Sequence, residues 1–428
     1  MKSIARMLLT VVLGIGACLD RADAASRPNG WACSAPALPS PTGRVVRVST
    51  EPELQSAIGS LTSGTTILIA PGTYTLTSTL WLNQGTNDVT IRGSTDSCDD
   101  VVLVGKGMSN SSYGNVPHGI WIGRAQRVTV ADLTIKDVWY HSIQLDPGQG
   151  AQAPRIYNVH LIDAGEQFVK SSSDADGTGV NDGVVEYCTI EYTTTARSNY
   201  TNGVDVHQGA SWIVRRNLFR NIRAPQGQFA GPAILMWNRS SGSIVDSNVL
   251  LNCQYGIALG LNPAVSDDHQ GGIVRNNFVY RTSDQSGDVA ITINNSANTK
   301  VLHNTVVLSG TYPNAIEYRF AATTGMEIRY NLTDGQVTKR DGASATVAGN
   351  VTNAQASWFV NAASGDLHLA KTATGAIDKA SAHADVVTDF DGEGRTTGAA
   401  PDVGADEISA VGVDTVPPAA PKDLRIVK

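Results

Sequence analysis

A short run of strand-forming residues around an asparagine returns repeatedly through the middle of the chain. The asparagine stands at positions 158, 217, 248, 277, 304, 331 and 350, and Asp132 and Cys188 take the same place in two further copies. Successive positions from 132 to 350 are 26, 30, 29, 31, 29, 27, 27 and 19 residues apart. A period of this size predicts a solenoid, because each coil then buries its apolar surface only by stacking on its neighbours.

Each copy of the repeat alternates apolar and polar residues and ends at Gly, Asn, Asp or Ser, which is typical of strands joined by turns. The 42 glycines and the charged fraction of 17% suit the same structure. We therefore predict an all-β fold, a single right-handed parallel β-helix over residues 45–355. The aligned asparagines are expected to form one column at a bend, where side-chain amides bond the coils above and below and left-handed backbone is tolerated.

The two ends of the predicted β-helix carry different sequences. Thr50-Glu51-Pro52-Glu53 is a capping-box pattern followed by apolar residues at helical spacing, so a short helix is expected to cover the N-terminal end. Residues 25–44 are interpreted as a linker and residues 356–408, where the repeat fades, as a C-terminal capping region. The proline-rich residues 409–428 are interpreted as an extended tail.

The N-terminus is typical of exported proteins. Lys2 and Arg6 precede an apolar run over residues 7–19, and Ala22-Asp23-Ala24 offers a cleavage site, so residues 1–24 are interpreted as a signal peptide. The run is too short to span a bilayer. Ile15-Gly16-Ala17-Cys18 also resembles a lipoprotein signal, which leaves open that Cys18 is lipidated and retained. In either case the protein is expected in an extracellular or periplasmic location.

Export places the other four cysteines in an oxidising compartment, where disulfides form. Cys33 and Cys98 lie in loop-like sequence outside the repeat, and we predict that they pair. Cys188 and Cys253 are interpreted as buried residues of the wall.

A further alignable strand occurs in each coil after the asparagine. Its first and third residues are apolar and are expected to face the core, so the second and fourth project outward on one flat face. The aligned segments are Ile143-Gln144-Leu145-Asp146, Val204-Asp205-Val206-His207, Ile234-Leu235-Met236-Trp237, Ile257-Ala258-Leu259-Gly260, Ile291-Thr292-Ile293-Asn294 and Ile316-Glu317-Tyr318-Arg319. Lys170 takes an outward position in the coil before Asp205.

Three residues of this face are the predicted catalytic set. Asp205 and His207 are two residues apart and project from the same side of one strand, close enough to serve as an acid and a base at one ring carbon. Lys170 lies one coil away. The alternative interpretation is that all three are solvated residues of an exposed strand.

The same face is expected to form a groove for several sugar rings, reaching Arg319 four coils, or about 19 Å, from His207. Its predicted substrate-binding residues are Gln144, Trp237, Asn294, Glu317 and Arg319. Glu317 and Arg319 pairing with each other or with their neighbours is the structural alternative.

An oxygen-rich loop after Lys170 is a candidate site for Ca²⁺, the one cofactor that the sequence suggests. Asp174, Asp176 and Asp182 are the candidate ligands, although no glutamate stands at the last position of an EF-hand register. The net charge of −7 without a basic cluster argues against a nucleic-acid partner. An acidic polysaccharide needs only a local basic patch. We expect a monomer with no membrane span.

The segment Asn202-Gly203-Val204-Asp205-Val206-His207-Gln208, with the strand that follows it, resembles the Asp-Pro-His segment of mannuronan C5-epimerases, which also place a lysine in the preceding coil. The likeness covers about 50 residues and implies that His207 or Lys170 removes the C5 proton of a uronate while a cation neutralises its carboxylate. Val206 replaces the family's proline, Asn202 stands where a tyrosine is expected with Tyr200 nearby, and Ile234 to Trp237 lack the expected aspartate.

More broadly, most of the chain resembles secreted bacterial β-helix proteins, including polysaccharide lyases of the alginate and chondroitin type. The leading hypothesis is an enzyme that abstracts the C5 proton of a uronic-acid polysaccharide and ends in β-elimination or epimerisation. A surface protein that only binds glycans is the second hypothesis. A β-helix glycoside hydrolase ranks third, because hydrolysis needs two flanking carboxylates and Asp205 has no equally placed partner.

Overall fold

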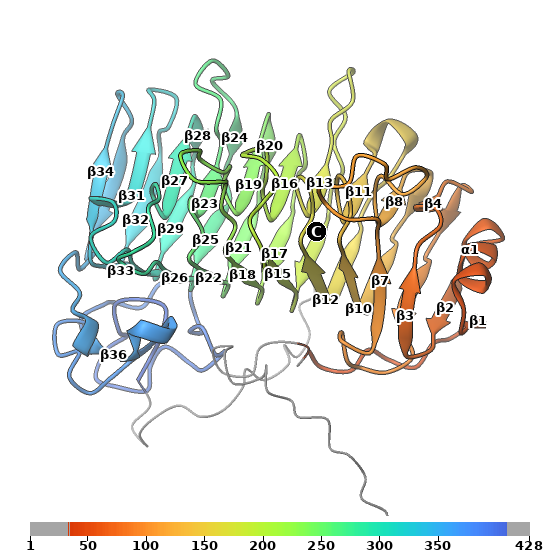
Figure 1. Ribbon diagram of the computed structural model, residues 1–428. Coiled ribbons are helices and arrows are strands. Elements are labelled where there is room, and N and C mark those ends of the chain that lie inside the picture. The colour runs from red at the N-terminus through yellow and green to blue at the C-terminus, as the bar shows by residue number, and fades with distance from the viewer. Residues whose placement is uncertain (1–32, 34, 409–428) are drawn as a thin grey trace, which may run out of the picture.

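The computed structural model describes residue 33 and residues 35–408, which form an elongated stack of parallel coils (Figure 1). The predicted signal peptide with Cys18, most of the residue 25–34 stretch and the predicted tail lie outside these residues. None of the helices among the described residues has the length and apolar character needed to cross a membrane.

Each complete coil contributes strands to three parallel ladders, where the sequence predicted two. The first two ladders belong to one 20-stranded sheet, and long strands β10 and β12 run through both of them. The first ladder consists of β1 (Arg44–Val48), β2 (Thr65–Ile69), β6 (Thr90–Gly93), β10 (Thr129–Lys136), β12 (Arg155–Ile162), β14 (Val184–Glu186), β17 (Ile213–Arg215), β21 (Ile244–Asp246), β25 (Ile273–Arg275), β29 (Lys300–Leu302), β32 (Met326–Arg329) and β35 (Ala345–Ala348). The second ladder adds β3 (Gly72–Thr75), β7 (Val101–Val104), β15 (Thr189–Glu191), β18 (Leu218–Arg220), β22 (Val249–Leu251), β26 (Phe278–Tyr280), β30 (Thr305–Val307) and β33 (Leu332–Thr333).

The third ladder is a separate ten-stranded sheet and contains the outward face that the sequence predicted. Its strands are β4 (Leu80–Leu82), β8 (Ile120–Ile122), β11 (Ile143–Leu145), β13 (Val169–Ser171), β16 (Val204–His207), β19 (Ile234–Trp237), β23 (Ile257–Leu259), β27 (Ile291–Asn294), β31 (Asn314–Arg319) and β34 (Gln336–Lys339). Short strands pair at the turns: β5 (Thr86–Asn87) with β9 (Ala125–Gln126), and β20 (Ser240–Ser241) with β24 (His269–Gln270) and β28 (Ser296–Ala297).

The core fills the inside of the coils. The inward residues of the third ladder, such as Val204, Val206, Ile291 and Ile293, are completely buried and belong to one continuous apolar cluster. The predicted inward positions are therefore confirmed for β16 and β27. Each coil buries its apolar residues against the coils before and after it, which is why the repeat is the unit of this fold.

The asparagine column forms at the bend between the first and second ladders. From Asn217 to Asn331 each side-chain amide donates to the Oδ1 of the asparagine one coil on, over 2.8 to 3.0 Å. Asn158 donates in the opposite direction, to Asp132 of the preceding coil, and Cys188 interrupts the ladder between Asn158 and Asn217.

One detail of the predicted bend is wrong for most coils. Asp132 and Asn158 themselves have positive φ, at 53° and 51°. In the later coils the residue before the asparagine has the left-handed conformation, for example Ser247 before Asn248 and Asn276 before Asn277. The asparagine is thereby free to turn its amide inward along the stack.

A nine-residue helix, α1 (Glu51–Gly59), lies at the N-terminal end of the stack, as predicted (Figure 1). The hydroxyl of Thr50 accepts from the backbone of Glu53, and the Glu53 carboxylate accepts from the backbone of Thr50, so both halves of the capping box are present. Leu54, Ala57 and Ile58 face the first coils and are buried. The helix thus covers apolar surface that no preceding coil is there to cover.

The C-terminal region packs against the side of the stack instead of capping its end. It contains 3₁₀ turns η4 (Ala356–Trp358) and η5 (Ala362–Ser364) and an antiparallel pair, β36 (Phe359–Asn361) and β37 (Asp366–Leu369). Phe390 stacks on Phe278 of the second ladder, in a cluster that also holds Leu218 and Val249. The second-ladder strands thus have apolar residues on their outer side too, and the C-terminal region shields these residues from water.

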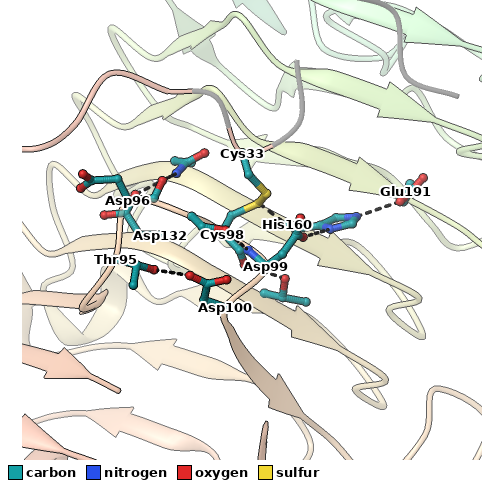
Figure 2. Close-up of a disulfide and its surroundings, with 12 residues drawn as sticks. Cys33, Thr95, Asp96, Cys98, Asp99, Asp100, Asp132, His160 and Glu191 are labelled. Atoms are coloured by element: carbon teal, nitrogen blue, oxygen red, sulfur yellow. Dashed lines mark hydrogen bonds and ion pairs between the residues drawn. A yellow bond between two sulfur atoms is a disulfide. The ribbon is translucent and has the colours of Figure 1, made fainter. Parts of the chain in front are cut away.

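Cys33 and Cys98 form a disulfide, with their Cα atoms 5.0 Å apart (Figure 2). Cys98 lies in the turn between β6 and β7, so the bridge ties the start of the described chain to the side of the early coils. Residues of the following segment contact the same side, where Tyr157 donates to the carbonyl of Pro36. Cys188 and Cys253 are free and buried, as interpreted from the sequence.

Candidate functional site

Lys170 and Asp205 are direct neighbours in the third ladder. The register pairs Gln144 of β11 with Lys170 of β13, and Lys170 with Asp205 of β16. The residues flanking them in each strand, such as Val169 and Val204, are buried in the core, so Lys170 and Asp205 project from the opposite face. The strand parity inferred at Phe168 to Lys170 places Lys170 on the predicted face.

Lys170, Asp205 and His207 are within hydrogen-bond reach of one another. Lys170 Nζ donates to Asp205 Oδ2 over 2.5 Å and lies 2.7 Å from His207 Nε2. His207 Nε2 is 3.4 Å from Asp205 Oδ1. The side chains of Lys170 and Asp205 are only 8% and 3% exposed, whereas that of His207 is 18% exposed. His207 is thus the member of the cluster that most readily meets a ligand.

Trp237, in the next coil, contacts both Asp205 and His207. Its register partner is His207, and its indole Nε1 donates to Asp205 Oδ1 over 2.9 Å. The Trp237 and His207 rings meet edge to face, with centroids 4.6 Å apart. The indole N–H thus holds Asp205, and sugar binding by the half-buried Trp237 ring stays a prediction.

Asp205 carries its charge although it is buried. Burial alone would raise the pKa of Asp205, but the hydrogen bond with His207 and the charge of Lys170 hold that pKa below its ordinary value. Each oxygen of the carboxylate has a donor, Oδ1 from Trp237 and Oδ2 from Lys170. The Asp205 carboxylate is therefore a fixed negative charge, and it holds the Lys170 ammonium and the His207 imidazole together on the outward face of the third ladder.

On the C-terminal side of this cluster the predicted groove has smaller or apolar side chains. In register after Asp205 come Leu235, Ala258 and Thr292, which are buried as Gln144, Lys170 and Asp205 are. Asn294 is buried too and donates to the carbonyl of Gly260. The sugar groove from Lys170 to Arg319 stays a prediction.

The last two residues of the predicted groove form ion pairs with a later coil. Glu317 is buried and accepts from Arg340, while Arg319 donates to Asp341 over 2.8 Å. The structural alternative left open whether Glu317 and Arg319 pair with each other or with neighbours, and the ion pairs formed are with neighbours. At the other end Gln144 is buried and donates to the hydroxyl of Ser172.

The three aspartates proposed for Ca²⁺ do not converge. Among the described residues, groups of three or more potential ligands whose atoms lie within 4.8 Å of one another include none of Asp174, Asp176 and Asp182. Asp174 accepts from the backbone of Ala175, and Asp176 accepts from that of Thr178. The carboxylates of Asp174 and Asp176 therefore stabilise the loop itself, and calcium binding at the three aspartates stays a prediction.

A buried group that could hold a cation lies instead in the C-terminal region, where His368, Asp391 and Asp406 bring ligand atoms within 4.8 Å of one another. His368 already contacts two carboxylates, with Nδ1 on Asp366 and Nε2 2.9 Å from Asp391. Burial alone would lower the pKa of His368, but these contacts raise it to about 11. A protonated imidazole thus supplies the positive charge that these carboxylates require.

A ring cluster that the sequence did not single out lies at the turn before the third ladder. His118 and His141 stack with centroids 5.2 Å apart, and burial lowers their pKa values to about 4 and about 3. Glu166 is 3.8 Å from His141 and 3.1 Å from Arg197. The charge of Lys170 affects the pKa values of His141 and Glu166, so this cluster and the Lys170 cluster share one electrostatic environment.

Two tryptophans extend the outward column of the third ladder toward the N-terminal end. Trp81 of β4 pairs in register with Trp121 of β8, and Trp121 pairs with Gln144. The sequence signal was available, because Leu80-Trp81-Leu82 and Ile120-Trp121-Ile122 alternate as the later strands do. The intervals between these early strands are long and unequal, so an alignment based on the repeat period did not include them.

A family model described as the right-handed β-helix region matches residues 118–332, which is half of the chain. The chain belongs to the right-handed β-helix family. A comparison with curated protein sequences finds no significant match.

Solved structures with the same right-handed β-helix fold include pectate lyase Pel9A, which is 14% identical with a TM-score of 0.54 over 86% of this chain and 96% of that one. An alginate lyase from Paenibacillus sp. str. FPU-7 is 16% identical with a TM-score of 0.48, over 72% of this chain and 99% of that one. The tailspike protein of E. coli bacteriophage HK620, in complex with a pentasaccharide, is 15% identical with a TM-score of 0.47, over 72% and 58%. At 14% identity the likeness to pectate lyase Pel9A shows the fold alone.

Proposed function

We propose that this right-handed β-helix protein is an exported, monomeric enzyme that removes the C5 proton from uronate residues of an acidic polysaccharide. The observation that carries the proposal is the meeting of one ammonium and one imidazole on a single buried carboxylate, with Lys170 Nζ 2.5 Å from Asp205 and 2.7 Å from His207. The C5 proton of a uronate becomes acidic only when a cation stabilises the enolate that its loss creates. A cation and a base within reach of one ring carbon therefore match this reaction.

His207 is the proposed base, through Nε2. In the base form of His207 the proton is on Nδ1, so Nε2 no longer donates to Asp205 and instead accepts from Lys170 Nζ, 2.7 Å away. A substrate carboxylate that draws the ammonium toward itself releases the Nε2 lone pair, so binding of the uronate both neutralises the carboxylate and activates the base. Asp205 accepts from Lys170 and Trp237 throughout and holds the charged group in place.

Two outcomes follow from the same first step. The C5–H bond breaks, its proton goes to His207 Nε2, and the electron pair is delocalised into the carboxylate as an enolate. In elimination the electron pair then forms the C4–C5 double bond, the C4–O bond breaks, and the leaving oxygen takes a proton. In epimerisation a water molecule on the opposite face gives a proton to C5, the resulting hydroxide takes up the proton held by His207, and the C4–O bond stays intact.

The fold gives this proposal modest support by analogy. Pectate lyase Pel9A shares the β-helix and is by its name a lyase of an acidic polysaccharide. A surface protein that only binds glycans stays the second candidate. The Lys170–Asp205 ion pair is buried, and a buried ion pair can have a purely structural role.

The test is to incubate the protein with alginate, polygalacturonate, chondroitin and hyaluronan, and to follow unsaturated product by far-ultraviolet absorbance and C5 proton exchange in deuterated water. We expect one polymer to react, and His207→Ala to lower the rate about 10² to 10⁴-fold. His383→Ala is the matched control, since the His383 side chain is 15% exposed against 18% for His207 and lies in the C-terminal region. A wild-type protein that neither cleaves nor exchanges any polymer contradicts the proposal.

A further inference from the structure

We infer that Trp81 and Trp121 form a stacking subsite for the same polysaccharide, so that a bound chain extends from Lys170 toward the N-terminal end of the β-helix. The inference rests on the proposed function for the class of ligand, a uronate polymer. It adds a place where sugar rings bind without reacting, and it assigns the direction in which the substrate runs along the protein.

The two tryptophans continue the column that contains the reactive cluster. The register runs from Trp81 through Trp121 and Gln144 to Lys170, one residue per strand. Adjacent strands are about 4.8 Å apart, which places Trp121 about 10 Å and Trp81 about 14 Å from Lys170 along the ladder. A polysaccharide that presents one uronate to Lys170 can therefore present its following rings to the tryptophans.

Both rings are available and held in position. Trp81 is 38% exposed, although it is a large apolar side chain between two buried leucines. Trp121 is half-buried, and its ring lies against Gly123, where an added Cβ would come within 2.5 Å of the indole. The two indoles also contact each other, with centroids 4.9 Å apart at an angle of 59°. Rings restrained in this way lose little conformational entropy when a ligand stacks on them.

In the opposite direction this column contains no aromatic ring. The column positions after Asp205 are Leu235, Ala258 and Thr292. A polysaccharide chain that leaves Lys170 along this column thus meets tryptophan rings on the N-terminal side only.

The size of the patch favours sugar rings over a protein partner. Trp81 is the only large apolar side chain of the third ladder that is exposed among the described residues, and Asn83, Gln84 and Arg124 around it are exposed and polar. A stable interface between protein chains buries on the order of 1,200 Å² or more, with an apolar centre. Isolated aromatic rings framed by polar groups suit a pyranose, which has apolar C–H faces and polar edges.

The experiment measures binding of uronate oligosaccharides, from disaccharide to octasaccharide, prepared from alginate, polygalacturonate, chondroitin and hyaluronan. Wild-type affinity is expected to rise with length once a chain is long enough to reach Trp81. In Trp81→Ala the affinity for long chains should fall about tenfold or more, while disaccharides bind as before. Trp81→Phe keeps a ring and should retain most of the gain, and Val387→Ala, an exposed apolar residue of the C-terminal region, is the control.

The outcomes separate this inference from the proposed function. Length-dependent binding that needs Trp81, without cleavage or C5 exchange, sustains the subsite and overturns the reaction. If the wild type turns over a polymer but Trp81→Ala binds every chain length as the wild type does, the subsite alone is overturned. The subsite is also overturned if Trp81→Ala raises KM equally for the shortest and the longest substrates. Absence of binding to all four polymers, or a concentration-dependent dimer that Trp81→Ala abolishes in sedimentation, also overturns it.

Discussion

At the scale of the residue, the cluster on β13 and β16 is costly to build. Lys170 and Asp205 are charged groups withdrawn from water, and each loses several kcal/mol of hydration unless partners replace it. His207 and Trp237 provide part of that replacement, since each contacts Asp205 or Lys170 directly. Such an arrangement is sensitive to the loss of any single member.

We predict that Lys170→Met lowers the free energy of unfolding by about 3–5 kcal/mol, because it leaves the buried Asp205 carboxylate without its counter-ion. The double variant with Asp205→Leu should recover most of that loss. Lys300→Met is the control, since Lys300 pairs with Asp385 at a partly exposed position and should cost about 0–1 kcal/mol. Thermal unfolding measures all three, and equal losses for the two lysines would refute the buried charge.

At the scale of the element, the asparagine ladder joins the first and second ladders along one line. Asn277 Oδ1 accepts from both the backbone N–H and the side-chain amide of Asn248, and its own amide donates to Asn304. All three are completely buried, so no water is at hand to replace a lost partner. Each asparagine side chain therefore forms hydrogen bonds with backbone groups at the bend, where the hydrogen bonds between strands do not extend.

Asn277→Ala is expected to destabilise the protein by about 2–5 kcal/mol, because two buried donors of Asn248 lose their acceptor. Asn353→Ala, at an exposed position after the last coil, should change little. Because coils interact mainly with their neighbours, hydrogen exchange of β22 and β26 is a better measurement than a single melting temperature. Unchanged exchange in these two strands would argue against the ladder as a source of stability.

At the scale of the whole molecule, the C-terminal region contains buried groups that bind protons more strongly than usual. Burial raises the pKa values of Asp389 and Glu407 to about 7, and contacts with Asp366 and Asp391 raise that of His368 to about 11. Each group binds protons more strongly when folded, so its stabilisation is present at low pH and is lost as the pH rises. For the two acids the loss falls between about pH 4 and 7, and for His368 between pH 6.5 and about 11.

We therefore expect the C-terminal region to detach in alkali before the β-helix unfolds. Limited proteolysis at rising pH should cut within residues 356–408 first. The titration of His368 should lower the free energy of unfolding of this region by at most about 1.4 kcal/mol per pH unit. His368→Gln should be less stable at neutral pH and should flatten this dependence above pH 7, whereas His383→Gln should keep it. Cleavage that begins within the coils, or a region equally resistant at every pH, would contradict the assignment.

The sequence alone determined the features that depend on local order. The period, the strand parity and the capping box are properties of neighbouring residues, and so the coils, the outward position of Lys170 and helix α1 could be predicted. Which outward side chains are buried was decided by the tertiary structure, because the coils stacked on Leu235 and Thr292 come from other parts of the chain. The same holds for Trp81 and Trp121, which are 40 residues apart and touch only because two coils stack.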